Sequence, residues 1–336
     1  MKAFQIQAPR TAAVIDIPHL GEAGMGEVLL KVNLVGMCGT DLSTYRGANA
    51  MVGFPRIPGH EVAATVVEGV GDLTAGTAVT VSPYTQCGTC PSCRRGRPNA
   101  CQHNETMGVQ RDGAMTEYIS VPRGRIYAAN LSLKELCLVE PLTVGAHAAA
   151  RGRATADDTV AVFGCGGIGL GAIASAAFRG ASVIAIDMDD RKLEVARKAG
   201  ASFLINTARQ NLHQRLQEIT EGNGPDVVIE AIGLPLTFRA AVEEVAFTGR
   251  VVYIGYAKEP VSYETRLFVQ KELDILGSRN ALPEDFRDVI RMLEAGRFPV
   301  TEAVSAIVSP EEAAATLAEW SENPGRFTKI QVEFSA

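Results

Sequence analysis

A strand, a glycine-rich turn and a helix follow one another without interruption from residue 159 onward. The apolar segment 159–163 runs directly into residues 164–169, Gly-Cys-Gly-Gly-Ile-Gly, after which a helical pattern begins. Short apolar segments then alternate with helical segments as far as residue 277, a pattern typical of parallel strands joined by crossover helices. The expected strands are 159–163, 182–187, 202–205, 226–230, 250–255 and 273–277. This part of the chain is therefore predicted to form a doubly wound parallel sheet.

The glycine turn has the spacing G-x-G-x-x-G between a strand and a helix. In a dinucleotide-binding site the first glycine forms the tight turn, the second lets the backbone approach a pyrophosphate, and the third lets helix and strand pack closely. The free N–H groups at the helix N-terminus favour the anion. We expect a dinucleotide to bind at Gly164, Gly166, Gly167, Ile168 and Gly169. The alternative is a glycine-rich connector without a ligand.

Asp187 ends the second expected strand of this sheet. A carboxylate there can bind both ribose hydroxyls of NAD and would repel the 2′-phosphate of NADP. Asp189 and Asp190 add to that repulsion, whereas the nearby cation Arg191 could favour NADP. The sequence therefore predicts NAD as the cofactor. A turn or helix-capping role for Asp187 is the alternative.

The parts of the chain on either side of this sheet differ from it in composition and in the pattern of apolar residues. Before residue 138, short apolar runs rich in β-branched residues are broken by Gly and Pro, which indicates strands with irregular loops. After residue 282, two helical segments and a last strand are expected at 283–295, 310–322 and 328–334. At 336 residues the chain is too long for one core, so two domains are predicted, one α/β and one rich in β-structure.

Four of the cysteines lie in one loop, residues 86–101. Cys87, Cys90, Cys93 and Cys101 have the spacing C-x₂-C-x₂-C-x₇-C. Four thiolates at short spacing, with Gly and Pro to bend the loop, suit a closed tetrahedral zinc site. An iron–sulfur cluster or disulfides are the alternatives. Because a closed site has no open coordination position, this zinc is predicted to be structural and to bind no substrate.

Charge and composition exclude several classes of protein. Lys and Arg number 32 against 38 Asp and Glu, a formal charge of −6 without any basic block, so nucleic acid is not expected as a partner. No apolar run reaches the roughly 18–20 residues that span a bilayer. The segment 1–10 lacks the apolar core of a signal peptide. We therefore expect a cytoplasmic protein without a membrane partner, in a compartment where clustered cysteines more often bind metal than form disulfides.

A second metal site is suggested by three short motifs. Cys38 begins Cys-Gly-Thr-Asp, His60 stands in Pro-Gly-His-Glu, and Glu140 stands in Val-Glu-Pro-Leu-Thr. A lone cysteine or histidine would be unremarkable. Together with the cysteine loop and the glycine turn, in this order, they resemble the zinc-dependent medium-chain dehydrogenase family, which contains alcohol, sorbitol and threonine dehydrogenases. The resemblance covers essentially the whole chain.

Within that family, the chain most resembles the sorbitol, polyol and sugar-acid branch. Glu140 stands where alcohol dehydrogenases have a third ligand, a cysteine. The resemblance implies a GroES-like β-rich catalytic domain with an inserted Rossmann domain and the active site in the cleft between them. The implied boundaries are 1–145 for the first part of the catalytic domain, 146–277 for the Rossmann domain and 278–336 for the return.

The resemblance also implies a catalytic zinc held by Cys38 and His60. Glu61 or Glu140 would contribute directly or through water, and Asp41 would orient His60. Physical chemistry agrees with this role, because an open zinc position lowers the pKa of a bound alcohol. The alkoxide can then release hydride to the nicotinamide.

Further residues of the implied site lie in two loops. Thr40 would hydrogen-bond the substrate hydroxyl and begin the route of its proton to solvent. Many relatives carry a relay histidine where this chain has Ser43, so Ser43 is either a relay member or a solvated loop residue. Tyr45, Arg46 and Arg279 are candidates for substrate contact. Arg279 could bind several hydroxyls or a sugar-acid carboxylate, or else contact the cofactor or the domain interface.

We expect a dehydrogenase with two zinc ions per chain that passes hydride from a secondary alcohol to NAD, giving a ketone. The expected substrate is a polyhydroxylated small molecule: a polyol, a sugar or a sugar acid such as a hexonate. A threonine-type or simple alcohol is the nearest alternative, and a catalytically silent relative is a more distant one. Relatives commonly associate through the last strand of the Rossmann sheet, here 273–277, so a homodimer or homotetramer is expected.

Overall fold

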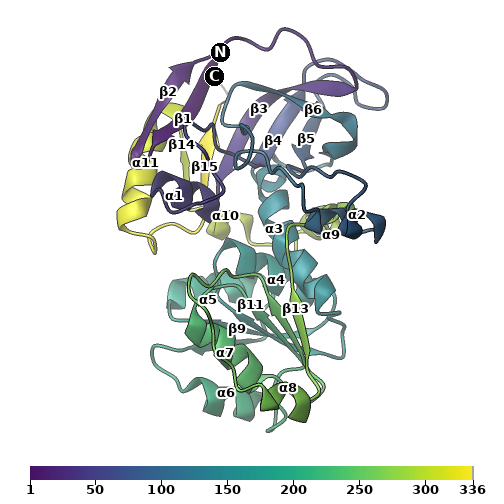
Figure 1. The fold of residues 1–336 in the computed structure, drawn as a ribbon, viewed down its shortest axis with the longest axis vertical. Coiled ribbons are helices and arrows are strands. Elements are labelled where there is room, and N and C mark those ends of the chain that lie inside the picture. Colours follow the sequence, from purple (N-terminus) through teal and green to yellow (C-terminus); the bar gives the residue numbers. More distant parts are fainter. Residues whose placement is uncertain (335–336) are drawn as a thin grey trace. The chain divides into compact units, whose positions relative to one another are not determined.

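The computed structural model describes residues 1–334 and consists of two compact units. Unit 1 joins Met1–Glu140 to Val300–Ala336, and unit 2 is Pro141–Pro299. Unit 1 is thus built from both ends of the chain, which Figure 1 shows by its purple-to-blue and yellow ribbons. The return to unit 1 comes at residue 300 instead of the expected 278, because the helix Pro283–Glu294 packs within unit 2.

Unit 2 contains a six-stranded parallel sheet in the order β10-β9-β8-β11-β12-β13. Most positions in the inner strands are buried, as expected for strands covered on both faces. The predicted doubly wound parallel sheet is confirmed. The strands are β8 (Thr159–Phe163), β9 (Ser182–Asp187), β10 (Phe203–Asn206), β11 (Val227–Glu230), β12 (Arg250–Tyr253) and β13 (Asp274–Gly277). The helices are α4 (Gly167–Phe178), α5 (Asp190–Lys198), α6 (Leu212–Ile219), α7 (Pro235–Glu244), α8 (Arg266–Gln270) and α9 (Pro283–Glu294).

Helix α3 (Leu133–Arg151) begins in unit 1 and continues into unit 2. In unit 2, His147 on α3 lies 2.8 Å from the Asp285 carboxylate at the start of α9, and both side chains are buried. This pair explains why α9 belongs to unit 2, since it joins the helix to α3. Asp285 also accepts a hydrogen bond from the Leu282 N–H and so caps α9.

Unit 1 is a β-rich unit, as predicted. It contains a two-stranded sheet, β1 with β2, and a seven-stranded sheet in the order β14-β15-β3-β4-β5-β7, with β6 paired to β3. The strands are β1 (Lys2–Ala8), β2 (Thr11–Asp16), β3 (Glu27–Met37), β4 (Glu61–Val66), β5 (Ala78–Val81), β6 (Tyr118–Pro122), β7 (Ile126–Ala128), β14 (Ala306–Val308) and β15 (Ile330–Glu333). Its other helices are α1 (Gly39–Tyr45), α2 (Pro91–Arg94), α10 (Val300–Ala303) and α11 (Pro310–Glu322), with 3₁₀ turns at Pro98–Ala100 and Arg123–Arg125.

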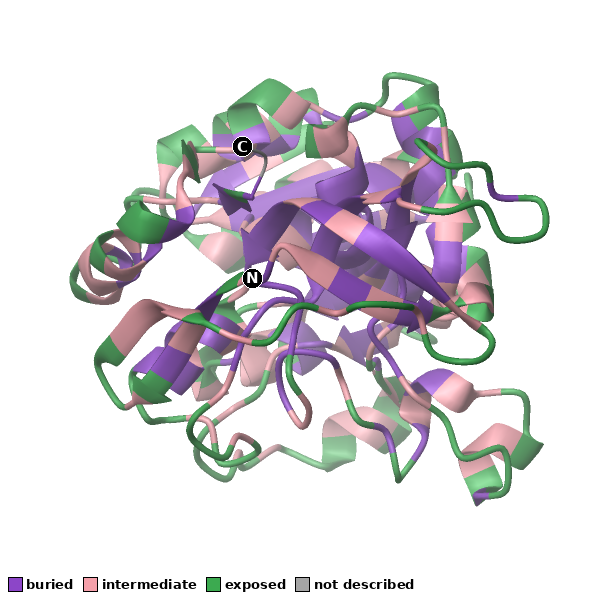
Figure 2. Cartoon of the chain, turned by 90° about the horizontal axis from the view of Figure 1, so that it is seen from above, coloured by how far each residue is buried: buried purple, intermediate pink, exposed green. Residues whose placement is uncertain are grey.

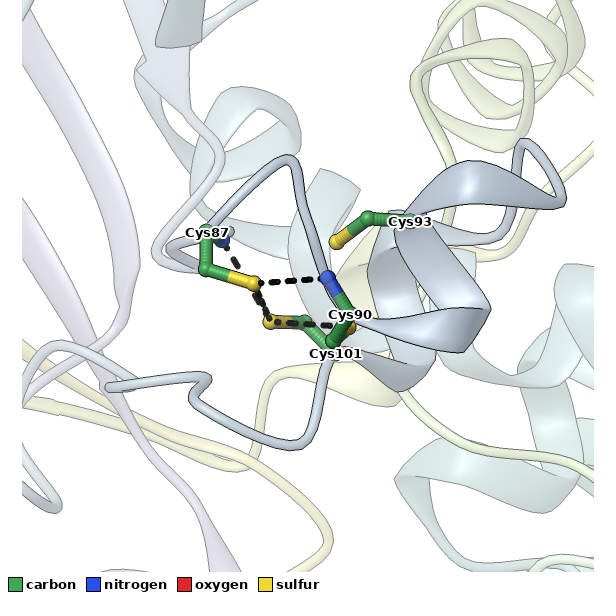
Figure 3. Close-up of side chains that lie close together, drawn as sticks. All are labelled: Cys87, Cys90, Cys93 and Cys101. Carbon is green, nitrogen blue, oxygen red and sulfur yellow. Dashed lines mark hydrogen bonds between the residues drawn. The ribbon is translucent and has the colours of Figure 1, made fainter.

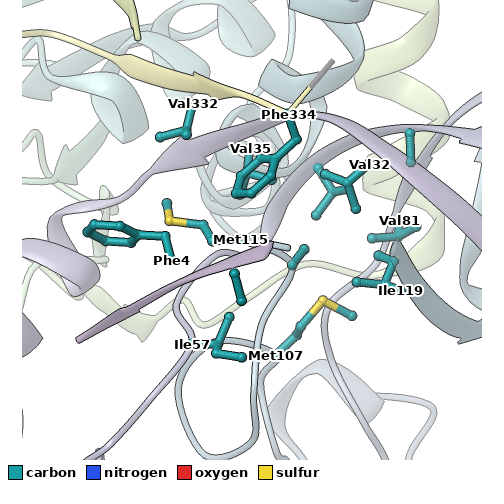
Figure 4. Close-up of a cluster of buried hydrophobic side chains, with 14 of the residues drawn as sticks. Phe4, Val32, Val35, Ile57, Val81, Met107, Met115, Ile119, Val332 and Phe334 are labelled. Carbon is teal, nitrogen blue, oxygen red and sulfur yellow. The ribbon is translucent and has the colours of Figure 1, made fainter. Parts of the chain in front are cut away.

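The core of unit 1 is formed by residues from both ends of the chain. Phe4, Val35 and Met115 pack with Val332 and Phe334 in one buried cluster (Figure 4). Buried residues follow the strands, and exposed residues follow the loops and the outer helix faces (Figure 2). The C-terminal segment therefore belongs to the core of the unit that the N-terminal segment begins.

The register of three neighbouring strands brings distant residues together. In β3 and β4, Gly36 lies opposite Glu61. In β15 and β3, Ile330 lies opposite Met37. The end of β3 and the starts of β4 and β15 therefore meet at one edge of the sheet.

Among residues 1–334, no helix has both the length and the apolar character needed to cross a membrane.

Candidate active site and metal centres

Cys38, His60 and Glu61 form a cluster at this edge of the seven-stranded sheet. One potential ligand atom from each lies within 4.8 Å of the others. Cys38 directly follows β3 and precedes α1, while His60 and Glu61 lie where β4 begins. His60 and Glu61 are buried and Cys38 is partly buried. Thiolate, imidazole and carboxylate together are a donor set that suits zinc.

The Glu61 carboxylate is paired with a lysine from the far end of the chain. The Lys329 Nζ lies 2.6 and 2.7 Å from the two carboxylate oxygens and 3.3 Å from the Met37 carbonyl. The side chains are 0% exposed for Glu61 and 8% for Lys329. Burial raises the pKa of Glu61, and Lys329 opposes that rise. Burial lowers the pKa of Lys329, but the negative charges of Glu61 and Cys38 and the hydrogen bond to Glu61 together outweigh burial, and the pKa is raised.

Lys329 was not identified from the sequence. The only local signal is a lysine directly before an apolar strand, which is common on protein surfaces. The pairing of β15 with β3 is what carries this lysine to Glu61.

Gly36 leaves the space that the Glu61 carboxylate occupies. A Cβ at Gly36 would lie 1.9 Å from Glu61 Oε2. Gly36→Ala is therefore expected to displace the carboxylate and to cost about 1–3 kcal/mol of unfolding free energy, as overpacking does. The measurement is chemical denaturation. Gly39→Ala is the matched control, because a Cβ at Gly39 meets nothing within 4 Å; equal losses in the two variants would contradict the explanation.

Glu140 is held by a tyrosine that sequence reasoning also missed. The Tyr84 hydroxyl donates a hydrogen bond to Glu140 Oε1, and both side chains are buried. Burial raises the pKa of Glu140. Burial and the Glu140 charge raise the pKa of Tyr84 well above its ordinary value, so Tyr84 stays a hydrogen-bond donor at neutral pH.

Asp41 makes a different hydrogen bond from the one expected. Its Oδ2 accepts from the Cys38 N–H at 2.9 Å, which caps α1. Asp41 Oδ1 and His60 Nδ1 are buried without a hydrogen-bond partner, so the structure does not contain the predicted orienting bond between these two residues. Burial lowers the pKa of His60, but the nearby Cys38 and carboxylates outweigh it and the pKa is raised. An imidazole among anionic donors is an environment suited to a cation.

Thr40 and Ser43 lie on α1, which follows Cys38. The Cys38 Sγ lies 3.5 Å from the Thr40 hydroxyl, so the hydroxyl is beside the metal-binding cluster. The Ser43 carbonyl accepts from the Ala48 N–H, and the residue is partly buried. The structure thus brings Thr40 to the cluster and gives no direct contact between Ser43 and the cluster.

Two predicted substrate residues have structural partners. Tyr45 is buried in the core of unit 1. Arg46 donates from Nε to Ser321 Oγ at 3.0 Å and from Nη2 to the Ser321 carbonyl near the end of α11. A helix C-terminus has unsatisfied carbonyls, and arginine is a common partner for them. The structure thus gives both residues partners within the chain, and their contact with substrate stays a prediction. Arg279 follows β13 in unit 2.

The four cysteines of the loop converge as a metal site requires. Their sulfur atoms all lie within 4.8 Å of one another, and Figure 3 shows the Cys93 sulfur directed toward the other three. The Cys101 sulfur lies 3.7 Å from that of Cys87 and 3.8 Å from that of Cys90. Two sulfurs on one tetrahedral zinc would be about 3.8 Å apart, given zinc–sulfur bonds of about 2.3 Å.

The disulfide alternative is excluded for this loop, because a disulfide needs a sulfur–sulfur distance of about 2 Å and all four cysteines are free. The Ser92 hydroxyl, 3.1 Å from the Cys90 sulfur, lowers the pKa of Cys90 to about 5. The thiolate is the metal-binding form of cysteine. The loop is therefore well suited to hold a metal ion.

The glycine turn between β8 and α4 has the conformation expected of it. Gly164 has φ +95°, and a Cβ at Gly169 would lie 1.8 Å from the Gly164 carbonyl oxygen. Packing within the chain therefore requires both glycines. A Cβ at Gly166 would meet nothing within 4 Å, and its φ of −76° is open to any residue. The space beside Gly166, at the N-terminus of α4, is free for a pyrophosphate to approach the backbone.

Asp187 ties the end of β9 to the glycine turn. Its Oδ2 accepts from the Cys165 N–H at 2.8 Å, and its Oδ1 accepts from the N–H groups of Met188 and Asp189. Arg191 pairs with Asp189 at 3.1 Å. Asp187 therefore has the turn role that was the alternative in the sequence, and its partly buried carboxylate stands at the end of the strand beside the glycine turn.

Known protein families and relatives match most of the chain. Two family models match the chain, "Alcohol dehydrogenase GroES-like domain" over residues 24–130 and "Zinc-binding dehydrogenase" over residues 167–295. An uncharacterized zinc-type alcohol dehydrogenase-like protein of Haemophilus influenzae is 33% identical over 340 residues, which cover 99% of each chain. L-galactonate-5-dehydrogenase of Escherichia coli K12 is 34% identical over 286 residues, 84% of this chain and 83% of the relative.

A solved structure has the same fold over the whole chain. It is an alcohol dehydrogenase from Escherichia coli CFT073 complexed with the cofactor NADH, with a TM-score of 0.90 and 29% identity. The match covers 99% of each chain.

Proposed function

Because this chain belongs to the zinc-dependent medium-chain dehydrogenase family, we propose that it oxidises a secondary alcohol of a polyol, sugar or sugar acid to a ketone, with NAD as the hydride acceptor. Membership of the family makes it an oxidoreductase that uses zinc and a nicotinamide cofactor. One observation carries the proposal: the cluster of Cys38, His60 and Glu61, with Glu140 in the place of a second cysteine.

The residues of the cluster fit a catalytic zinc. Cys38, His60 and Glu61 would hold the ion, with Glu140 as a further carboxylate ligand or the partner of a bound water. When bound, such a zinc lowers the pKa of an alcohol and favours the alkoxide. The Thr40 hydroxyl beside Cys38 is suited to accept the substrate's hydroxyl proton and pass it toward solvent. The loop of four cysteines would hold the second, structural zinc.

Lys329 adds a positive charge to this site. Cys38, Glu61, Glu140 and the buried Asp41 are acidic groups, and Lys329 together with a bound zinc would offset their negative charges. Opposite charges lower the cost of burying such groups. A carboxylate in place of a cysteine thiolate leaves the formal charge of the ligand set unchanged.

The NAD assignment is supported by charges near the end of β9. Asp187 is proposed to bind the ribose hydroxyls, and a carboxylate there disfavours a 2′-phosphate. The guanidinium groups of Arg191 and Arg209 pair with Asp189 and Asp190, at 3.1 and 2.7 Å. Both cations thus have carboxylate partners already, and Asp189 and Asp190 add negative charge that would repel a 2′-phosphate.

A sugar acid or polyol as substrate is supported by the relative that acts on L-galactonate. Arg279, in the segment after β13, is proposed to bind the hydroxyls or the carboxylate of such a substrate. A simple alcohol has only the hydroxyl that reacts and no further polar group for a guanidinium to bind. The substrate therefore gains affinity from its additional hydroxyl or carboxylate groups.

The test is NAD reduction against hexitols, pentitols, aldoses, hexonates, threonine and simple alcohols. We expect one polyhydroxylated compound to exceed simple alcohols in kcat/KM by about 30- to 150-fold, because two or three extra hydrogen bonds contribute about 1 kcal/mol each. NADP should be clearly poorer than NAD. Threonine as the best substrate, or equal kcat/KM with the two cofactors, would contradict the corresponding part of the proposal.

A further inference from the structure

We propose that Tyr84 is a positioning residue for Glu140, and that the loop of four cysteines serves the other metal site by holding Tyr84 in place. This inference rests on the proposed function, since it assigns Glu140 to the catalytic zinc. It also gives the closed cysteine site a purpose beyond local stability.

The two carboxylates near the cluster are held in different ways. Both oxygens of Glu61 are engaged by the Lys329 ammonium group. Glu140 accepts a hydrogen bond at Oε1 from the neutral phenol of Tyr84. A hydrogen bond from Tyr84 restricts rotation of this carboxylate and so directs it, whereas a full ion pair at both oxygens competes with a metal for the same electrons. Tyr84 therefore fixes the direction of the Glu140 carboxylate.

Because the hydrogen bond between Tyr84 and Glu140 is buried, its loss is costly. Tyr84 and Glu140 are both almost fully buried, so loss of the phenol hydroxyl leaves a carboxylate oxygen without water to replace it. A tyrosine hydroxyl has an ordinary pKa of about 10 and keeps its proton at neutral pH, so Tyr84 acts as a hydrogen-bond donor and carries no charge. Its role is to fix an orientation.

The base of the cysteine loop holds the backbone on both sides of Tyr84. The Met107 N–H donates to the Pro83 carbonyl at 3.0 Å. The Thr85 N–H donates to Asn104 Oδ1 at 3.2 Å, and the Glu105 N–H donates to Thr85 Oγ1 at 2.6 Å. Residues 83–85 and 104–107 flank the loop of four cysteines. A metal that closes the loop therefore keeps these two segments together and holds Tyr84 against Glu140.

The test is the zinc affinity of the more readily removed ion, measured by competition with a chromophoric chelator. Tyr84→Phe keeps the ring and deletes only the hydroxyl. We expect a 10–100-fold weaker affinity for that ion, the range found for partners of metal ligands, with the other zinc retained. Tyr253→Phe is the matched control, because it too deletes one hydrogen-bonded tyrosine hydroxyl. The Tyr253 hydroxyl donates to the Phe238 backbone carbonyl at 2.9 Å, and the zinc affinities of this variant should not change.

A double-mutant cycle tests whether Tyr84 acts through Glu140. In a Glu140→Ala background, Tyr84→Phe should have no further effect on zinc affinity. An unchanged affinity in Tyr84→Phe, or an equal loss with and without Glu140, would overturn the inference. Failure of the proposed function would be seen separately: none of the alcohols would support NAD reduction by the wild-type protein. The zinc measurements do not depend on turnover, so the two outcomes can be distinguished.

Discussion

Cys38→Ala is expected to lower the zinc content from two ions per chain to one and to reduce kcat/KM by at least about 1,000-fold. The reason is that the thiolate is one of the few ligands of an open site, and the Lewis acid contributes several kcal/mol of transition-state stabilisation. The measurements are metal analysis of the purified protein and NAD reduction with the best substrate of the panel. The variant should keep the zinc of the cysteine loop and its fold.

Cys137→Ala is the matched control for this prediction. Cys137 is a buried thiol near the same site, with its sulfur 3.4 Å from the Glu61 carbonyl oxygen, but it is outside the cluster of potential ligands. It should keep both zinc ions and most of the activity. Two zinc ions and wild-type turnover in Cys38→Ala would show that the cluster does not hold the catalytic metal.

Lys329→Met is expected to destabilise the metal-depleted protein by about 3–5 kcal/mol, the cost of leaving one member of a buried ion pair uncompensated. Glu61 is fully buried and would lose its cation. Chemical denaturation after chelation measures the loss. Added zinc should restore part of the stability, because the ion supplies positive charge at the same carboxylate.

The pH dependence of this effect has a definite sign. Because the pKa of Lys329 is raised in the folded protein, the pair contributes stability that is complete below the ordinary lysine pKa of about 10.4. That contribution is lost as pH rises through the raised pKa. The difference between wild type and Lys329→Met should therefore shrink in strong alkali. It should also shrink toward acid pH, because burial raises the pKa of Glu61 and the protonated carboxyl does not need a cation.

Two further variants test whether the loss of stability comes from the uncompensated charge of Glu61 or merely from replacing a lysine. Glu61→Gln combined with Lys329→Met should recover much of the stability, since no uncompensated charge remains. Lys2→Met removes a lysine that pairs with Glu311 at 2.8 Å, with both side chains 56% exposed, and should change stability little. A Lys329→Met loss as small as that of Lys2→Met would refute the buried-pair explanation.

The elements that were predicted most accurately depend on local patterns. The predicted strands 159–163 and 182–187 have the same bounds as β8 and β9. Alternation of apolar strands and helices, with glycine at the turn, is readable over a few residues at a time. The cysteine loop is likewise a local pattern, because close spacing along the chain brings the four thiols together.

Prediction is limited where the partner of a residue is distant in sequence. Arg46 could be placed on the loop after the zinc motif, but nothing local indicates that Ser321 of α11 accepts its hydrogen bonds. The domain boundary was set at 278 because the last strand of the sheet ends there, whereas the contact of Asp285 with His147 keeps α9 in unit 2. Both contacts are tertiary and have no signal in the local sequence.

The sequence by itself determined the class of fold, the glycine turn, the closed cysteine loop and the three motifs of the second metal site, because each is encoded in spacing or in a resemblance carried by short motifs. Tertiary structure alone decided which groups hold the two carboxylates. Lys329 lies 268 residues from Glu61 and Tyr84 lies 56 residues from Glu140. Partners so far apart are selected by strand register and packing, and the need for them arises from burial, which exists only once the chain has folded.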